Sequence, residues 1–199
     1  MSRAAERLVE LIRATPPDAN AIAEHLDGLP FSERMAAIAG VGGPELQRRL
    51  YAATVGRPRV TLDDLVRADA PPLREFIFEG KNSLPVFTRF QKRFCRPPGT
   101  NGDPELWGYN HAAVGRLVGP GYFVVHPEWP GGVAIDYRRV PNEQPPGWPP
   151  VQRNDVGVSR LVYMDMVDLL RRVAKDVFIG SAHRDARELD NYFILCRTP

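Results

Sequence analysis

Residues 2–54 alternate apolar and charged positions with the period of an α-helix. In the first segment Leu8, Val9, Leu11 and Ile12 recur at helical spacing among charged residues. Prolines and glycines divide the pattern, which predicts four short helices, at 2–14, 18–27, 31–39 and 44–54. Because their apolar stripes are narrow, we expect these helices to pack on the rest of the chain rather than fold alone.

Single residues mark the expected helix ends. Asp18, Ser32 and Thr61 carry side-chain oxygens that can accept the unpaired N–H bonds of a first turn, so we expect them to be N-caps. Gly28 and Gly40 are predicted to end their helices.

Beyond residue 70 the chain is rich in aromatic residues and turns, and apolar residues alternate with period two. Of 18 aromatic residues, only Phe31 and Tyr51 lie before residue 70. Strands are predicted at 121–126, 133–140, 177–184 and 191–197, with hairpin turns at Gly131-Gly132 and 185–190. Helices are predicted at 84–94 and 164–174.

These elements indicate an α+β protein with a helical N-terminal part, 1–70, and an aromatic-rich, mainly β part, 71–199, that also holds two helices. Short antiparallel strands need a closed or covered sheet, because open edges expose unpaired backbone groups. We therefore expect one compact unit. Its layer of short N-terminal helices packs on a curved antiparallel sheet or a small β-barrel, with a helix plugging one end.

Composition and charge add a few constraints. The 199 residues carry a net charge of +2, which does not by itself indicate a nucleic-acid partner. Of the 20 prolines, eight gather at 97–104 and 141–150, which predicts two rigid loops at the rim of any pocket. There is no apolar run of signal-peptide or transmembrane length, and two cysteines fit a reducing compartment. We therefore expect a cytoplasmic protein without a transmembrane segment; the sequence indicates no oligomeric state.

The turn Gly40-Val41-Gly42 resembles the helix-hairpin-helix pattern, whose glycine turn presents backbone amides to a DNA phosphate. Leu50 fits the apolar position that follows, but Glu45 stands where a basic residue would help and Leu46 replaces a small residue. The alternative interpretation is two helices joined by a glycine-rich turn, and these departures favour it over DNA binding.

A basic segment without acidic residues lies between Glu79 and Asp103. On the predicted helix 84–94, apolar and basic residues would occupy mainly opposite faces. Either the aromatic residues are core and the basic side is solvated, or the basic side is an anion or membrane surface for phosphates or lipid headgroups. The residues of this surface are Lys81, Arg89, Lys92, Arg93 and Arg96.

Motifs for specific chemistry are missing from the sequence. The four histidines have no metal-ligand spacing, neither Cys95 nor Cys196 lies in a C-x-x-C pair, and there is no nucleophile elbow, P-loop or dinucleotide fingerprint. We therefore expect no metal site and no cofactor.

The leading hypothesis is that the β part binds a small, partly apolar ligand in a barrel-like cavity. Tyrosine and histidine near strand ends have an apolar body and one polar tip, which suits a pocket mouth. A shift of one residue in register would exchange Tyr137 for Asp136 at the pocket. Two alternatives stay open: an enzyme that uses a histidine–carboxylate pair in the same cavity, such as His183 with Asp136, and a protein- or DNA-interaction module formed by the helical part. The candidate ligand-binding residues are Tyr122, His126, Asp136, Tyr137, His183 and Tyr192.

Overall fold

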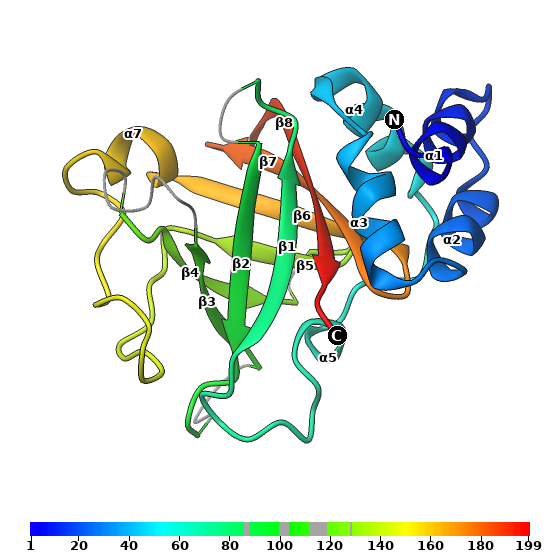
Figure 1. The fold of residues 1–199 in the computed structure, drawn as a ribbon. Coiled ribbons are helices and arrows are strands. Elements are labelled where there is room, and N and C mark those ends of the chain that lie inside the picture. The colour runs from blue at the N-terminus through cyan, green and yellow to red at the C-terminus, as the bar shows by residue number, and fades with distance from the viewer. Residues whose placement is uncertain (86–87, 100–103, 112–118, 128) are drawn as a thin grey trace.

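The strands of the computed structural model form a closed antiparallel barrel in which each strand pairs with the next and β1 pairs with β8 (Figure 1). The structure describes residues 1–85, 88–99, 104–111, 119–127 and 129–199. Closure leaves no sheet edge, as the expected barrel requires. The strands are β1 (Phe76–Asn82), β2 (Arg89–Cys95), β3 (Leu106–His111), β4 (Tyr122–His126), β5 (Val133–Asp136), β6 (Met166–Ala174), β7 (Val177–Arg184) and β8 (Arg187–Arg197).

The four predicted N-terminal helices precede the barrel nearly where the sequence places them, so the α+β prediction is confirmed. Asp18 is an N-cap as predicted, and Thr61 forms a capping box with Asp64. Ser32 is not an N-cap: Pro30 occupies that position and the third helix begins one residue before Ser32. The helices are α1 (Arg3–Arg13), α2 (Ala19–Asp27), α3 (Phe31–Ala39), α4 (Gly43–Ala53), the short α5 (Leu62–Leu65) and, between β5 and β6, α7 (Ser159–Tyr163).

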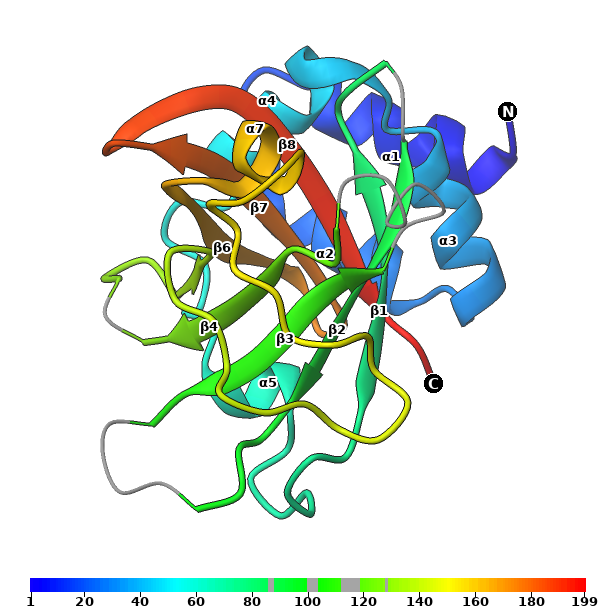
Figure 2. The same cartoon turned by 90° about the vertical axis from the view of Figure 1, so that its left-hand side faces the viewer.

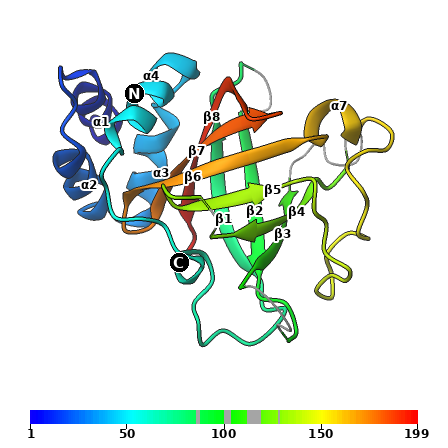
Figure 3. The same ribbon diagram turned by 180° about the vertical axis from the view of Figure 1, so that it is seen from behind.

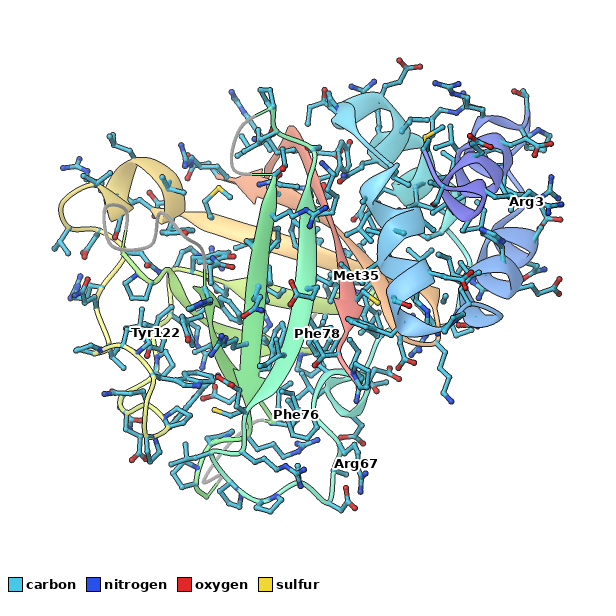
Figure 4. All side chains as sticks on the ribbon, in the orientation of Figure 1. Arg3, Met35, Arg67, Phe76, Phe78 and Tyr122 are labelled. Atoms are coloured by element: carbon cyan, nitrogen blue, oxygen red, sulfur yellow. The ribbon has the colours of Figure 1, made fainter. Side chains whose placement is uncertain are left out.

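Helices α1 to α4 cover the outer face of β6 to β8 (Figures 1 and 3). Outward-facing Ile179, Tyr192 and Ile194 join the apolar faces of the helices in one buried cluster, and Met35 of α3 packs against it (Figure 4). The helices thus share their core with the sheet, as their narrow apolar stripes predict.

A second core fills the barrel itself. Inward-facing Phe78, Phe94 and Phe178 are fully buried, and Phe94 and Phe178 both lie within 6 Å of the Phe78 ring. Leu62 and Leu65 of α5 belong to the same cluster, so α5 plugs one end of the barrel.

The proline-rich segments do not surround a common opening. The loop that contains 141–150 places Trp148 against the outer faces of β3 and β4, beside Tyr109 and Tyr122. The segment 97–104 joins β2 to β3 at the end plugged by α5; its residues 100–103 lie outside the described residues.

The predicted helices at 84–94 and 164–174 are wrong, because residues 89–94 belong to β2 and residues 166–174 form β6; residues 86–87 lie outside the described residues. In β2, Phe90 and Phe94 are four residues apart, a spacing that places them on one face of either a helix or a strand. In β6 both faces are apolar, since one lines the barrel and the other meets the helices, so the alternation typical of a strand is weak. The sequence reading also left β1 and β3 unassigned.

No helix in the described parts of the chain is long and apolar enough to cross a membrane.

Glycines make room for aromatic rings inside the barrel. Gly108 lies under the ring of Phe123, and Gly180 lies under that of Phe193. A Cβ added at Gly108 would be 2.3 Å from the Phe123 ring and 2.5 Å from the carbonyl oxygen of Arg93, closer than packed atoms approach.

We therefore expect Gly108→Ala to lower the free energy of unfolding by about 1–3 kcal/mol, the usual cost of overpacking a core. The measurement is urea denaturation followed by circular dichroism. Gly42→Ser is the control, because no atom lies within 4 Å of an added Cβ there and serine is a favoured N-cap. Equal stability of the two variants would contradict this account of the interior.

Candidate functional site

Four polar side chains meet inside the barrel and form what we call the Lys92 cluster: Lys92, Asn110, Tyr137 and Asp168. They come from β2, β3, the residue after β5, and β6. The pairing of Lys92 with Asn110 across β2 and β3 places both on the inner face. Asp168 pairs with Ile135, two residues before Tyr137, so the register brings these two together as well.

Every N–H bond of the Lys92 ammonium has an acceptor. Nζ donates to Asn110 Oδ1 at 3.0 Å, to Asp168 Oδ2 at 3.1 Å and to the Tyr137 hydroxyl. Asn110 Nδ2 donates to the same hydroxyl at 3.0 Å, and the hydroxyl donates to Asp168 Oδ2 at 3.1 Å. A buried charge needs such complete pairing, because removing an ion from water costs several kcal/mol.

Aromatic rings surround the cluster. The Lys92 ammonium lies 4.7 Å from the ring centre of Phe193 and 5.0 Å from that of Phe123, both within range of a cation–π attraction. Burial lowers the pKa of Lys92 and raises the pKa of Asp168, while their mutual attraction opposes both shifts. Burial also raises the pKa of Tyr137 well above its usual value. The pair is neutral overall whether the proton resides on Lys92 or on Asp168.

The Lys92 cluster lies toward the end of the barrel opposite α5. Toward α5, inward-facing Phe94 and Leu195 are fully buried. At the other end of the same barrel, Phe90 and Met166 are partly exposed. The four cluster residues lie between these limits, with exposed fractions of 2% to 8%. Among the described inward-facing residues, solvent exposure therefore begins at the cluster. We call the end opposite α5 (Figure 2) the open end.

Helix α7 lies across part of the open end. The Tyr163 ring stacks on Tyr137 with ring centres 5.3 Å apart and planes 13° apart. Arg184, at the end of β7, donates to the carbonyl oxygens of Leu161 and Val162 and holds the helix against the barrel. Tyr163 thus covers one side of the cluster.

Of the six candidate ligand-binding residues, the structure places only Tyr137 inside the barrel. Tyr122 faces outward and is buried under the loop of Trp148, where its hydroxyl donates to the Pro149 carbonyl at 2.5 Å (Figure 4). Asp136 is also outward, one residue from Tyr137, as alternation along a strand requires.

His126 and Asp136 form a pair on the outer face of β4 and β5. His126 Nε2 lies 3.7 Å from Asp136 Oδ2, and Arg138 donates to both oxygens of the same carboxylate. Burial opposes ionisation of Asp136, but the Arg138 hydrogen bonds outweigh it and hold the pKa well below its usual range.

His183 and Tyr192 belong to another outward group on β7 and β8. Ser181 Oγ lies 3.0 Å from His183 Nε2 and donates to Glu188 at 2.9 Å; Tyr192 donates to Glu188 at 2.6 Å. The carboxylate therefore binds the two hydroxyls and not the second nitrogen of the imidazole, so this is not the geometry of a catalytic triad. The Tyr192 ring packs beside Tyr51 of α4.

The predicted basic surface does not exist as one face. Lys92 points into the barrel, Arg93 pairs with Glu75 on the outside, and Arg96 pairs with Asp63 near α5. Only Lys81 and Arg89 remain near the open end, opposite each other on β1 and β2.

The backbone amides of the glycine turn between α3 and α4 are hydrogen-bonded locally. The N–H groups of Gly40, Val41 and Gly42 each donate to a backbone carbonyl within the same turn, and Val41 is fully buried. Such a turn does not present free amides to a phosphate, so the structure gives the helix-hairpin-helix resemblance no support.

Both thiols are buried and unpaired with each other. Burial raises the pKa of Cys95 to about 12 and that of Cys196 to about 11, which leaves both as thiols at neutral pH. Among the residues that the structure describes, no group of three or more His, Cys, Asp or Glu side chains could hold a metal ion.

Sequence reasoning assigned Lys92 to the wrong environment and did not select Asn110, Asp168 or Tyr163. The signal for Lys92 was its spacing from Phe90 and Phe94, two residues away on either side. With period two, all three share one face, and that face is the apolar one. Nothing local marks Asn110 or Asp168, because their importance depends on strands that meet across the barrel.

The Lys92–Asp168 pair gives a direct stability prediction. Lys92→Met and Asp168→Asn each remove one partner of a buried ion pair, so each should lower the free energy of unfolding by about 3–5 kcal/mol. The double variant should lose clearly less free energy of unfolding than the two single variants lose together. Denaturant titration measures all four members of the cycle, with Arg153→Met as a control, since the exposed Arg153–Asp155 pair should contribute at most about 1 kcal/mol. Strict additivity would contradict the pairing.

Lys92→Met should also change how the free energy of unfolding depends on pH. In Lys92→Met, buried Asp168 has lost its cation. The pKa of Asp168 in the folded state therefore lies above its unfolded value of about 3.9. The folded state then binds more protons than the unfolded state above that pH, and stability falls as the pH rises. We expect the loss caused by Lys92→Met to be smaller at acidic pH than at neutral pH.

Comparisons of the chain with protein-family models, with curated proteins and with solved structures found no match, so the candidate site stands on its own geometry.

Proposed function

We propose that this protein binds a small, partly apolar and uncharged molecule at the open end of the barrel, with its polar group at the Lys92 cluster. The observation that carries the proposal is a neutral group of four hydrogen-bonding side chains, surrounded by aromatic rings, where solvent exposure inside the barrel begins. Small closed barrels hold a single ligand in this way.

The cluster favours a particular kind of head group. Lys92, Asn110 and Tyr137 can donate hydrogen bonds, and Asp168 can accept them. A hydroxyl or carbonyl group can join this network without adding charge. A carboxylate or ammonium would add an unbalanced charge to a buried neutral pair, at a large desolvation cost.

Aromatic side chains suit the apolar part of such a molecule. Phe90 and Phe193 lie edge to face with ring centres 5.9 Å apart, and Phe90 is partly exposed. Tyr163 is partly exposed on the opposite side, above Tyr137. An apolar chain or ring between these walls would remain in contact with aromatic surface as it leaves the cluster.

The enzyme alternative has less structural support than ligand binding at the Lys92 cluster. It requires a histidine and a carboxylate in the barrel, but His111, His126 and His183 face outward from their strands and His25 lies on α2. The pair of His126 and Asp136 is on the outer face.

Binding can be tested with N-phenyl-1-naphthylamine, an uncharged apolar fluorophore, followed by displacement with 1-octanol, octanoate and octylammonium. We expect the fluorophore to bind and 1-octanol to displace it better than either charged compound does. Absence of binding by the fluorophore and by 1-octanol, or tighter binding of a charged compound, would contradict the proposal.

The site within the chain can be tested with two matched variants. Tyr137→Phe removes one hydroxyl from the cluster and should weaken 1-octanol binding about fivefold, the value of one hydrogen bond. Tyr122→Phe removes the same atom on the outer face and should leave binding unchanged. If Tyr122→Phe weakens binding and Tyr137→Phe does not, the ligand lies outside the barrel.

A further inference from the structure

Exposed apolar side chains gather at one end of the molecule. Seven large apolar residues in the described ranges are strongly exposed, and five of these belong to two segments, the connection after β1 and the segment that contains α7. We call these five the apolar rim: Leu84 (36% exposed), Val156 (55%), Val158 (52%), Leu161 (77%) and Val162 (40%). Solvent-exposed apolar groups clustered in this way mark an interaction site.

The apolar rim flanks the open end of the barrel. Figures 1 and 2 show α7 and the end of β1, which Leu84 follows, at the same end, opposite α5. The two segments are held in place separately: Arg184 binds the carbonyl groups at the end of α7, and Ser83 Oγ accepts from the Tyr192 N–H at the base of the β1–β2 connection. The exposure of the rim is therefore built into the fold.

Exposed arginines accompany the rim. Arg160 lies in α7, Arg187 begins β8 and Arg89 begins β2, and all three are exposed and form no ion pair with a described residue. Exposed acids lie at the same end too: Asp165, Asp185 and Glu188, and also Asp155 and Asp190, which are each paired with an arginine. The described charges still leave an excess of cations, because Lys81 and Arg184 also lie there.

From this arrangement we infer that the open end docks onto the surface of a lipid bilayer that contains anionic lipid. The apolar rim enters the interface between headgroups and acyl chains, and Arg89, Arg160 and Arg187 contact headgroup phosphates. The inference goes beyond ligand binding and does not require it, but such docking would place the opening of the barrel against a phase that contains apolar molecules.

The shape of the rim favours a bilayer over a protein partner. Four of its five apolar side chains belong to the short segment 156–162, and Leu84 follows β1. The core of a protein interface would be a continuous packed patch rich in aromatic residues, which the five aliphatic rim residues do not form. Exposed apolar residues flanked by exposed arginines are complementary to a fluid anionic surface.

The test is co-sedimentation of the full chain with vesicles of phosphatidylcholine alone and of phosphatidylcholine mixed with phosphatidylglycerol. We expect binding to the mixed vesicles and weak binding to phosphatidylcholine alone. Leu161→Ser should lower the partition coefficient about tenfold, the value of burying one leucine side chain. Val158→Ser should also weaken binding, whereas Val55→Ser should not, because Val55 is comparably exposed (69%) but lies just after α4, outside the rim.

A second pair of variants tests the charges. Arg160→Gln with Arg187→Gln should reduce binding to mixed vesicles more than tenfold, since each arginine near an anionic surface contributes about fivefold. Arg3→Gln with Arg13→Gln makes the same change of net charge on α1, and binding should be almost unchanged. Binding to neither vesicle, or equal losses in the rim variants and their controls, would overturn the inference.

Fluorophore binding by the same variants keeps this inference separate from the proposed function. Leu161→Ser should bind N-phenyl-1-naphthylamine in solution as the parent chain does, since its side chain is 77% exposed and is not part of the Lys92 cluster. Loss of vesicle binding with intact fluorophore binding supports docking through the rim.

Discussion

The pairing of β1 with β8 is the constraint on which the rest of the structure depends. The two strands are hydrogen-bonded from the Phe78–Arg197 pair to the Asn82–Phe193 pair, and they close the sheet on itself. Closure gives every strand an inside and an outside, and it removes the solvent from the inside. A lysine on an inward position then has no route to water along its own strand. Lys92 must find its acceptors elsewhere, and β3, β6 and the residue after β5 supply them.

Closure also explains why so many strands are apolar on both faces. The inside is a core by itself, α1 to α4 cover the outside of β6 to β8, and the loop of Trp148 covers the outside of β3 and β4. Little of the outer surface remains for alternating polar residues. The outward-facing polar groups are consequently held in pairs and triples, such as Asp136 with Arg138 and Glu188 with Tyr192.

The sequence predicts those elements whose signals are local. The ends of α2 follow from Asp18 and Gly28, and the β7–β8 hairpin follows from two alternating runs joined by a polar turn. The sequence does not predict β2, because Phe90 and Phe94 satisfy the helical and the strand period equally well. The site is harder to predict for a related reason. Tyr137 and Asp136 are neighbours, so one faces into the barrel and the other faces out. Which of the two faces inward depends on the pairing with neighbouring strands, and the local sequence does not show that pairing. The residues Lys92, Asn110 and Asp168 become a group only after three separate strands have been placed in register.

The position of the helices has a consequence for how the molecule assembles. Helices α1 to α4 end at Ala53, and the strands that complete their core begin at Met166. During synthesis the helical segment therefore emerges from the ribosome long before β6 to β8 do. Until those strands are made, the apolar faces of the helices remain exposed to solvent. The β7–β8 hairpin forms from neighbouring residues, whereas the β1–β8 seam and the helix–sheet contact each close a loop of more than a hundred residues. Such long-range contacts slow folding. Pairing of the C-terminal strands is therefore the step that completes both the barrel and the core shared with the helices.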